Sequence, residues 1–208
     1  MLILPLILAV TLHEVAHGYA ALKMGDHTAR LAGRLTLNPI KHLDLFGSFL
    51  LPLVLKLSGS PIIFGYAKPV PVNYHNFREY RKGTLWVASA GVLANAILVV
   101  MSAALFQLLA ATMASWTQSQ FGLLFVFLFR LLEYSVIINC ILALFNLIPI
   151  PPLDGSRVLA GLVPGNYATR IDAWGSYGFF ILIILLYSGL LRYLWMPMAW
   201  LIKLLIGV

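Results

Sequence analysis

The feature that most restricts the fold of this chain is a long stretch without ionisable side chains. Between residues 83 and 129 the sequence contains no Asp, Glu, Lys, Arg or His. A water-soluble domain cannot cover such a stretch with polar surface, whereas an apolar helix of about 20 residues spans the hydrocarbon core of a membrane. The stretch has room for two such helices and is interrupted once by polar residues, at 115–120. It therefore predicts a membrane-spanning helical hairpin.

The composition extends this conclusion to the whole chain. Hydrophobic residues make up 61% of the 208 residues and charged residues only 10%, whereas a soluble domain carries about 25% charged residues. The length fits roughly four to six membrane crossings and leaves no room for a folded soluble domain. We therefore expect an all-α polytopic membrane protein, with about five to six membrane helices and short re-entrant strand or loop segments. We expect one membrane-embedded domain over residues 1–208, with a core at 1–163 and C-terminal helices at 173–208.

The basic residues indicate orientation in a lipid bilayer and not nucleic-acid binding. The net charge is +7, but the basic residues are dispersed between apolar stretches. Ten of the 14 Lys and Arg residues lie in three segments that flank the expected helices, at 23–41, 68–82 and 157–170, and such segments belong on the cytoplasmic side. This orientation places the second half of the first helix and the end of the helix at 121–147 at the same depth, near the cytoplasmic face.

Glycine, proline and polar breaks set the boundaries of the expected helices. The first helix ends near Gly25, which suits a helix C-cap, and the helix at 121–147 ends at a proline cluster. We interpret the first apolar segment as a membrane helix and not as a cleaved leader, because it lacks a basic start and continues into His13. The expected helices cover residues 1–24, 45–57, 84–114, 121–147, 173–191 and 193–206.

Two segments are predicted to be non-helical. Residues 31–37 alternate apolar with small or polar side chains, which favours a short strand. Residues 64–73 contain Gly65, Pro69 and Pro71, so we expect a re-entrant loop or an edge strand that protein or a wet cavity covers. An extended edge at residues 31–37 or 62–73 would be able to hold a substrate by strand addition.

The clearest chemical signal is the pattern HEVAH at residues 13–17. Positions i and i+4 share one face of a helix, so His13 and His17 can bind one zinc ion while Glu14 acts as general base. Ionisable side chains are costly in a membrane helix and indicate a function. The alternative is two buried, hydrogen-bonded histidines with an ion-paired glutamate.

Two histidines on one helix do not complete a zinc site, so a third protein ligand is required. Asp154 follows the proline cluster, at the membrane depth already assigned to HEVAH, and Gly155 allows a tight turn that aims its carboxylate inward. The alternative role for Asp154 is the N-cap of a short helix. The other candidates lie in interfacial segments or far along a helix: His27, His42, His75, Asp26, Asp44 and Glu133.

HEVAH, together with NLIPIPPLDG at residues 146–155, resembles the site-2 protease family of intramembrane zinc metalloproteases. The resemblance extends through GRLTLNPIKHLD, GYAKPVPVN and ASAGVLANAIL, and covers residues 11–159. It implies a compact family member without extra soluble domains. It further implies that one zinc ion is bound by His13, His17 and Asp154, that Glu14 is the catalytic base, and that Asn95 and Asn146 contact the substrate backbone.

The chain departs from the family pattern at two places. Family members often have GPxxN in the third helix, whereas here Gly91 is followed by Val92, with Asn95 retained. The family's HxDPxG reads HLDLFG at 42–47. Neither departure changes a predicted ligand. For Asn95 and Asn146, hydrogen bonding between helices is the alternative to substrate contact.

One charged pair lies inside the helix at 121–147. Arg130 and Glu133 are three residues apart and fall near the middle of the bilayer. We interpret them as a structural ion pair, with a gate or an oligomer contact as the alternative.

These observations predict an intramembrane zinc metalloprotease that cleaves transmembrane segments of membrane proteins, as in regulated intramembrane proteolysis. The expected location is a prokaryotic plasma membrane, with the active site near the cytoplasmic side. A non-catalytic zinc-binding partner protein and a metal transporter are the alternatives. The sequence does not determine the oligomeric state.

Overall fold

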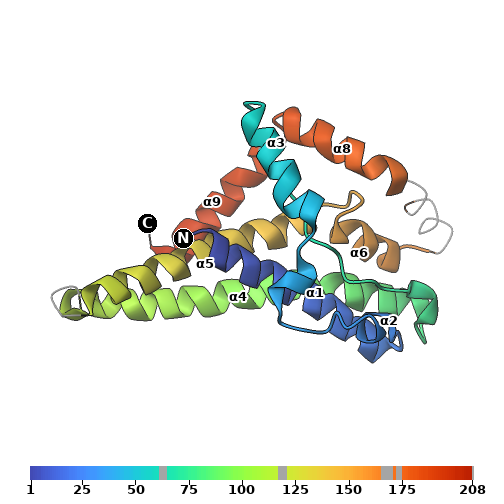
Figure 1. Cartoon of the computed structure of the whole chain (residues 1–208), viewed down its shortest axis with the longest axis horizontal. Coiled ribbons are helices and arrows are strands. Elements are labelled where there is room, and N and C mark those ends of the chain that lie inside the picture. Colours follow the sequence, from blue (N-terminus) through green and yellow to red (C-terminus); the bar gives the residue numbers. More distant parts are fainter. Residues whose placement is uncertain (61–64, 117–120, 165–170, 172–174, 208) are drawn as a thin grey trace.

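The computed structural model describes residues 1–60, 65–116, 121–164, 171 and 175–207, and within these ranges every regular element is a helix. The predicted hairpin is formed by α4 (Tyr80–Trp116) and α5 (Gly122–Asn146), which run side by side in opposite directions (Figure 1). α1 (Ile3–Met24) packs against both helices. Most of the polar break at 115–120 lies outside the described residues.

Among the described residues, three helices are long and apolar enough to cross a membrane, namely α1, α4 and α5. Their outward faces are apolar, with Val100 and Leu108 of α4 each 64% exposed. α4 has 37 residues and is about 55 Å long, so it extends beyond a hydrocarbon core of about 30 Å. The chain is an integral membrane protein by this criterion, and the predicted all-α polytopic fold is confirmed.

Shorter helices account for the remaining apolar segments. The helix expected at 45–57 forms as a π-helical turn, η2 (Leu45–Leu50), that continues into α3 (Leu51–Leu57). α8 (Gly175–Tyr187) and α9 (Arg192–Ile206) follow near the C-terminus. These three apolar helices have 10–17 residues each, which is too short to cross the bilayer directly. In the described residues, three long apolar helices and three short ones correspond to the expected five to six membrane helices.

The prediction of a strand at residues 31–37 is wrong. The chain forms α2 (Thr28–Leu31) and then turns at Gly33, whose φ is +63°. The Arg34 amide donates to the Ala29 carbonyl and closes this turn, so the following residues pair with no strand. The alternation of side chains reflects a helix end and a loop, not a sheet.

The segment at 65–73 is not helical, as predicted, and it is not an edge strand. It forms an extended loop between α3 and the single turn η3 (Tyr74–Asn76). Its amide groups are held by other elements: Tyr66 donates to the Gly47 carbonyl and Lys68 donates to the His42 carbonyl. η1 (Pro39–His42) supplies this second acceptor.

Apolar packing between α5, α4 and α9 forms the main core cluster. Val136 and Cys140 of α5 contact residues of α4 and α9, and α9 continues past the internal Pro197. On the exposed side of α5, Arg130 donates to Glu133 at 2.7 Å, which is the predicted ion pair. The buried residues of the cluster are Val99, Ala103, Phe106, Val136, Cys140, Met198 and Ile206.

Candidate metal centre

Three side chains from two distant parts of the sequence meet between α1 and α6 (Asp154–Leu162). The Nε2 atoms of His13 and His17 are 3.0 Å apart, and each lies 3.2 Å from Oδ2 of Asp154. Both histidines are buried, and Asp154 is half-buried. The structure thus brings together the three residues that the sequence predicts as metal ligands.

The geometry of this cluster fits a zinc ion. Ligand atoms about 2.0–2.2 Å from a tetrahedral zinc ion are about 3.3–3.6 Å from one another, close to the separations seen here. Oδ2 of Asp154 is buried and accepts no hydrogen bond from the described residues. A buried carboxylate oxygen without a donor is costly unless a cation neutralises it.

Asp154 begins α6, outside the three long helices. Burial opposes ionisation of its carboxyl group, and a metal ion held between Asp154 and the histidines would favour it. A carboxyl group has to be ionised to act as a metal ligand.

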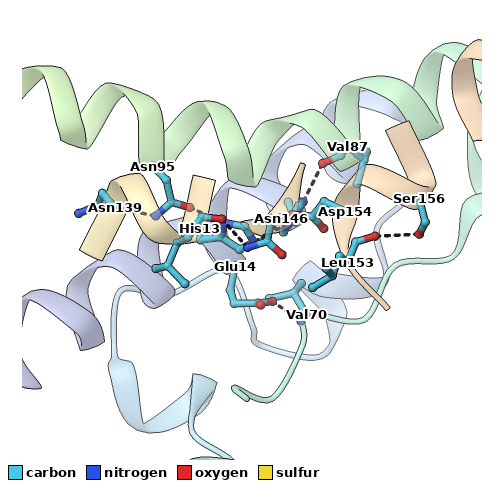
Figure 2. A network of polar contacts seen from close by, with 12 residues as sticks. His13, Glu14, Val70, Val87, Asn95, Asn139, Asn146, Leu153, Asp154 and Ser156 are labelled. Carbon is cyan, nitrogen blue, oxygen red and sulfur yellow. Dashed lines mark hydrogen bonds and ion pairs between the residues drawn. The ribbon is translucent and has the colours of Figure 1, made fainter. Parts of the chain in front are cut away.

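The outer nitrogen of each histidine is bound by α4. His17 Nδ1 lies 2.7 Å from the Val87 carbonyl oxygen, and His13 Nδ1 lies 2.6 Å from Oδ1 of Asn95 (Figure 2). Both partners are acceptors, so both Nδ1 atoms carry the proton. The Nε2 lone pairs then face the cluster, which is the arrangement that metal-ligating histidines require.

Gly91 makes room for the two imidazoles. It lies on α4 between Val87 and Asn95, one helical turn from each, and a Cβ atom at this position would contact Nε2 of His17 and Cε1 and Nδ1 of His13. α1 and α4 can therefore approach closely at the level of the cluster. Gly91 corresponds to the glycine of the family's GPxxN pattern. The close approach of the two imidazole rings to Gly91 explains why a glycine is needed there.

The backbone around Asp154 differs from the predicted tight turn and N-cap. Asp154 is the first residue of the helix, the N-cap position is Leu153, and no side-chain cap hydrogen bond forms. The N-cap role for Asp154 is therefore wrong. Gly155 lies within α6 and does not form a tight turn; a Cβ atom there would contact the carbonyl oxygens of Leu147 and Ile148. Gly155 thus lets the start of α6 pack against the end of α5.

Glu14 points from α1 toward the extended loop. Its Oε2 accepts a hydrogen bond of 2.7 Å from the Val70 amide (Figure 2). The end of this loop is fixed by Asp26, which is fully buried and accepts hydrogen bonds from the Asn73 amide and the Asn76 side chain. The loop that carries Val70 is therefore anchored just beyond the end of α1.

The two asparagines predicted to contact substrate lie in different surroundings. Asn95 is fully buried, and its side chain is shared between His13 and Asn139. Asn146 is partly buried at the end of α5, and its Nδ2 donates to the Leu142 carbonyl. The contacts of Asn95 match the alternative of hydrogen bonding between helices. Substrate contact by either asparagine stays a prediction.

Two neighbours of the site, Asn139 and Val70, were not predicted from the sequence. Asn139 is 1% exposed within the apolar α5, and a buried amide in a membrane helix was the available signal. Val70 takes part through its backbone amide, so its side chain carried no signal.

The comparisons with known proteins agree with this geometry. The sequence pattern described as "Peptidase family M50" matches residues 1–186. The chain belongs to this family, the site-2 protease family. It is 38% identical over 197 residues to "Putative zinc metalloprotease YwhC" of Bacillus subtilis (strain 168), covering 95% of this chain and 84% of the relative.

A second family relative is more distant. The chain is 27% identical over 190 residues to "Putative zinc metalloprotease Rip2" of Mycolicibacterium smegmatis (strain ATCC 700084 / mc(2)155), covering 89% of this chain and 66% of the relative. No solved structure matches the chain. The family and the names of both relatives support a metalloprotease and imply zinc, and the resemblance stated from HEVAH and NLIPIPPLDG is confirmed.

Proposed function

We propose that this member of the M50 family is an intramembrane zinc metalloendopeptidase that hydrolyses peptide bonds in transmembrane segments. The observation that carries the proposal is the convergence of His13, His17 and Asp154, with all three ligand atoms within 4.8 Å of one another. Glu14 adjoins the first ligand in the sequence, where a general base of this class belongs.

His13, His17 and Asp154 would hold the zinc ion, with one position left open. A zinc ion held by these residues would polarise the scissile carbonyl and lower the pKa of a water molecule to about 7. Glu14 accepts a proton from the attacking water as the new C–O bond forms. It then gives this proton to the amide nitrogen as the C–N bond breaks. The Val70 amide holds Oε2 of Glu14, which leaves Oε1 for the proton.

The position of the cluster supports a substrate within the membrane. His13 lies near the middle of α1, about 15 Å from either end. We further propose that the site lies toward the cytoplasmic side of a prokaryotic plasma membrane. The basic segments that flank the helices support the cytoplasmic orientation. A transmembrane substrate must unwind locally, because helical hydrogen bonds occupy its amide groups.

The loop at 65–73 offers little for substrate strand addition. Its amides at Tyr66, Lys68 and Val70 already donate to the protein. Pro69 and Pro71 have no amide hydrogen to donate. Residues 31–37 form no strand, so neither segment offers a ready strand edge to which a substrate could pair.

The test compares zinc content and cleavage of a helical membrane reporter in purified protein. We expect Glu14→Gln to retain one zinc per chain and to lose activity by about 10²-fold or more, because only the base is removed. Asp154→Asn should lose much of its bound zinc and much of its cleavage activity. Glu79→Gln, which changes an exposed carboxylate outside the site, should leave both unchanged.

Three outcomes would refute the proposal. A Glu14→Gln variant with full biological activity would indicate a non-catalytic zinc-binding partner protein. Zinc flux in liposomes without cleavage would indicate a transporter. A wild-type protein that binds no zinc would remove the metal centre itself.

A further inference from the structure

We propose that Asn139 is a positioning residue for the metal centre, which fixes through Asn95 the ring nitrogen of His13 that carries the proton. This inference rests on the zinc site of the proposed function. It concerns a residue two hydrogen bonds away from the metal ligand, on a different helix from both His13 and Asn95.

The side chains form a continuous chain of hydrogen bonds. Nδ2 of Asn139 lies 2.9 Å from the Ser135 carbonyl oxygen, one turn earlier in α5. Oδ1 of Asn139 accepts from Nδ2 of Asn95 at 2.7 Å. Oδ1 of Asn95 in turn lies 2.6 Å from Nδ1 of His13 (Figure 2).

The direction of this chain follows from its far end. The Ser135 carbonyl can only accept, so Asn139 must turn its NH₂ group toward it and its oxygen toward Asn95. Asn95 must then donate its NH₂ group to Asn139 and present its oxygen to His13. His13 consequently keeps its proton on Nδ1, and its Nε2 lone pair is available to the metal.

His17 shows why the longer chain is needed at His13. His17 faces the Val87 carbonyl directly, and a carbonyl fixes the tautomer without help. His13 faces an amide, which can offer either a donor or an acceptor. A reversed Asn95 would direct its NH₂ group at Nδ1, so the proton of His13 would move to Nε2 and block metal binding. Asn139 removes this second possibility.

Packing alone does not require an asparagine at this position. Asn139 is 1% exposed and Asn95 is fully buried, and α4 and α5 are already joined nearby by a hydrogen bond between Ser102 and Ser135. A buried amide is costly in an apolar helix bundle, whereas leucine would fill a similar volume.

The test measures zinc affinity by chelator competition in purified wild-type protein and three variants. Asn139→Leu removes the acceptor for Asn95, and we expect zinc to bind about tenfold more weakly. Asn139→Asp has the same shape and keeps an acceptor facing Asn95 whether or not it is protonated. Its affinity should stay within about twofold of wild type. Ser102→Ala, which removes a neighbouring hydrogen bond between the helices, should also leave the affinity unchanged.

A second measurement covers the case in which Asn139→Leu does not fold. In metal-free protein with ¹⁵N-labelled histidine, the His13 signal should report Nδ1–H in both wild type and Asn139→Asp. The inference is overturned if Asn139→Leu binds zinc as tightly as wild type, if Asn139→Asp loses affinity, or if His13 carries its proton on Nε2. If wild type binds no zinc, the proposed function fails first, so the two failures are distinguishable.

Discussion

The face of α4 that meets the two histidines presents a carbonyl, a glycine and an amide, at Val87, Gly91 and Asn95. These three positions are one helical turn apart, so they form a single stripe opposite His13 and His17. Val87 contributes a carbonyl acceptor, and Gly91 leaves room for the two imidazole rings. Asn95 contributes an amide oxygen, which accepts a hydrogen bond only if the amide group has the correct orientation. At the scale of single residues, the site therefore depends on α4 as much as on the HEVAH motif.

The glycine of this stripe gives a prediction at the same scale. Gly91→Ala places a methyl group against both imidazoles, so the histidines must move apart from their ligand geometry. We expect zinc affinity to fall by about 10- to 100-fold, measured by chelator competition. Val100→Ala, on the exposed face of the same helix, is the control and should bind zinc like wild type. Unchanged affinity in Gly91→Ala would show that α1 and α4 separate easily at this point.

At the scale of elements, the loop at 65–73 is aligned with α1 through a buried carboxylate. Asp26 follows the left-handed Gly25 cap of α1 and accepts hydrogen bonds from Thr28, Asn73 and Asn76. Burial opposes ionisation of Asp26, but these hydrogen bonds outweigh it and lower the pKa of the carboxyl group below 3.8. Asp26 therefore stabilises the fold as an anion.

The sign of this pKa shift predicts a pH dependence. Because the folded-state pKa is lowered, the stabilisation is present above pH 3.8 and is lost as the pH falls through the folded-state pKa. At pH 7, Asp26→Asn should lower the free energy of unfolding by about 2 kcal/mol. The difference from wild type should shrink below about pH 4. Thermal unfolding in detergent at several pH values measures both effects.

The exposed Glu79 provides the comparison for Asp26. Glu79→Gln should change the free energy of unfolding by at most about 0.5 kcal/mol, because its partner Lys82 is also solvent-accessible. A pH-independent difference between wild type and Asp26→Asn would contradict the role of Asp26 as an ionised anchor.

At the scale of the whole molecule, the metal ligands connect the first helix to α6. His13 and His17 come from α1, and Asp154 comes from a short helix after the hairpin. A zinc ion bound by all three would link the two ends of the core around α4 and α5. Metal binding to the folded state alone stabilises that state.

Zinc should therefore raise the thermal unfolding temperature of the whole protein. At a free zinc concentration of about 1,000 times Kd, the stabilisation is about 4 kcal/mol. Wild type and Glu14→Gln should both respond, since Glu14 is not a ligand. The unfolding temperature of Asp154→Asn should rise much less with zinc. Chelation of the zinc should abolish the zinc-dependent difference between the variants. An equal zinc response in Asp154→Asn would exclude the α1–α6 link.

Composition and local patterns were sufficient to predict the membrane helices and the ligand residues. Long apolar runs specify helices because a membrane satisfies no backbone groups from outside, and α1, α4 and α5 form within a few residues of the expected bounds. The spacing within HEVAH places His13 and His17 on one face without reference to any other element. Asp154 followed from topology, which the basic segments encode.

The groups that surround these ligands could be identified only from the packing of the helices. The pairing of His13 with Asn95 and of Glu14 with Val70 joins residues 82 and 56 positions apart, and no local pattern encodes such contacts. The strand expected at 31–37 failed for the same reason, because alternation cannot show whether a partner strand exists. Long apolar runs and the HEVAH spacing were enough to specify the helices and the ligand types. The packing of α4 and α5 against α1 determined the orientation of each ligand, because hydrogen-bond direction depends on which partner lies within reach.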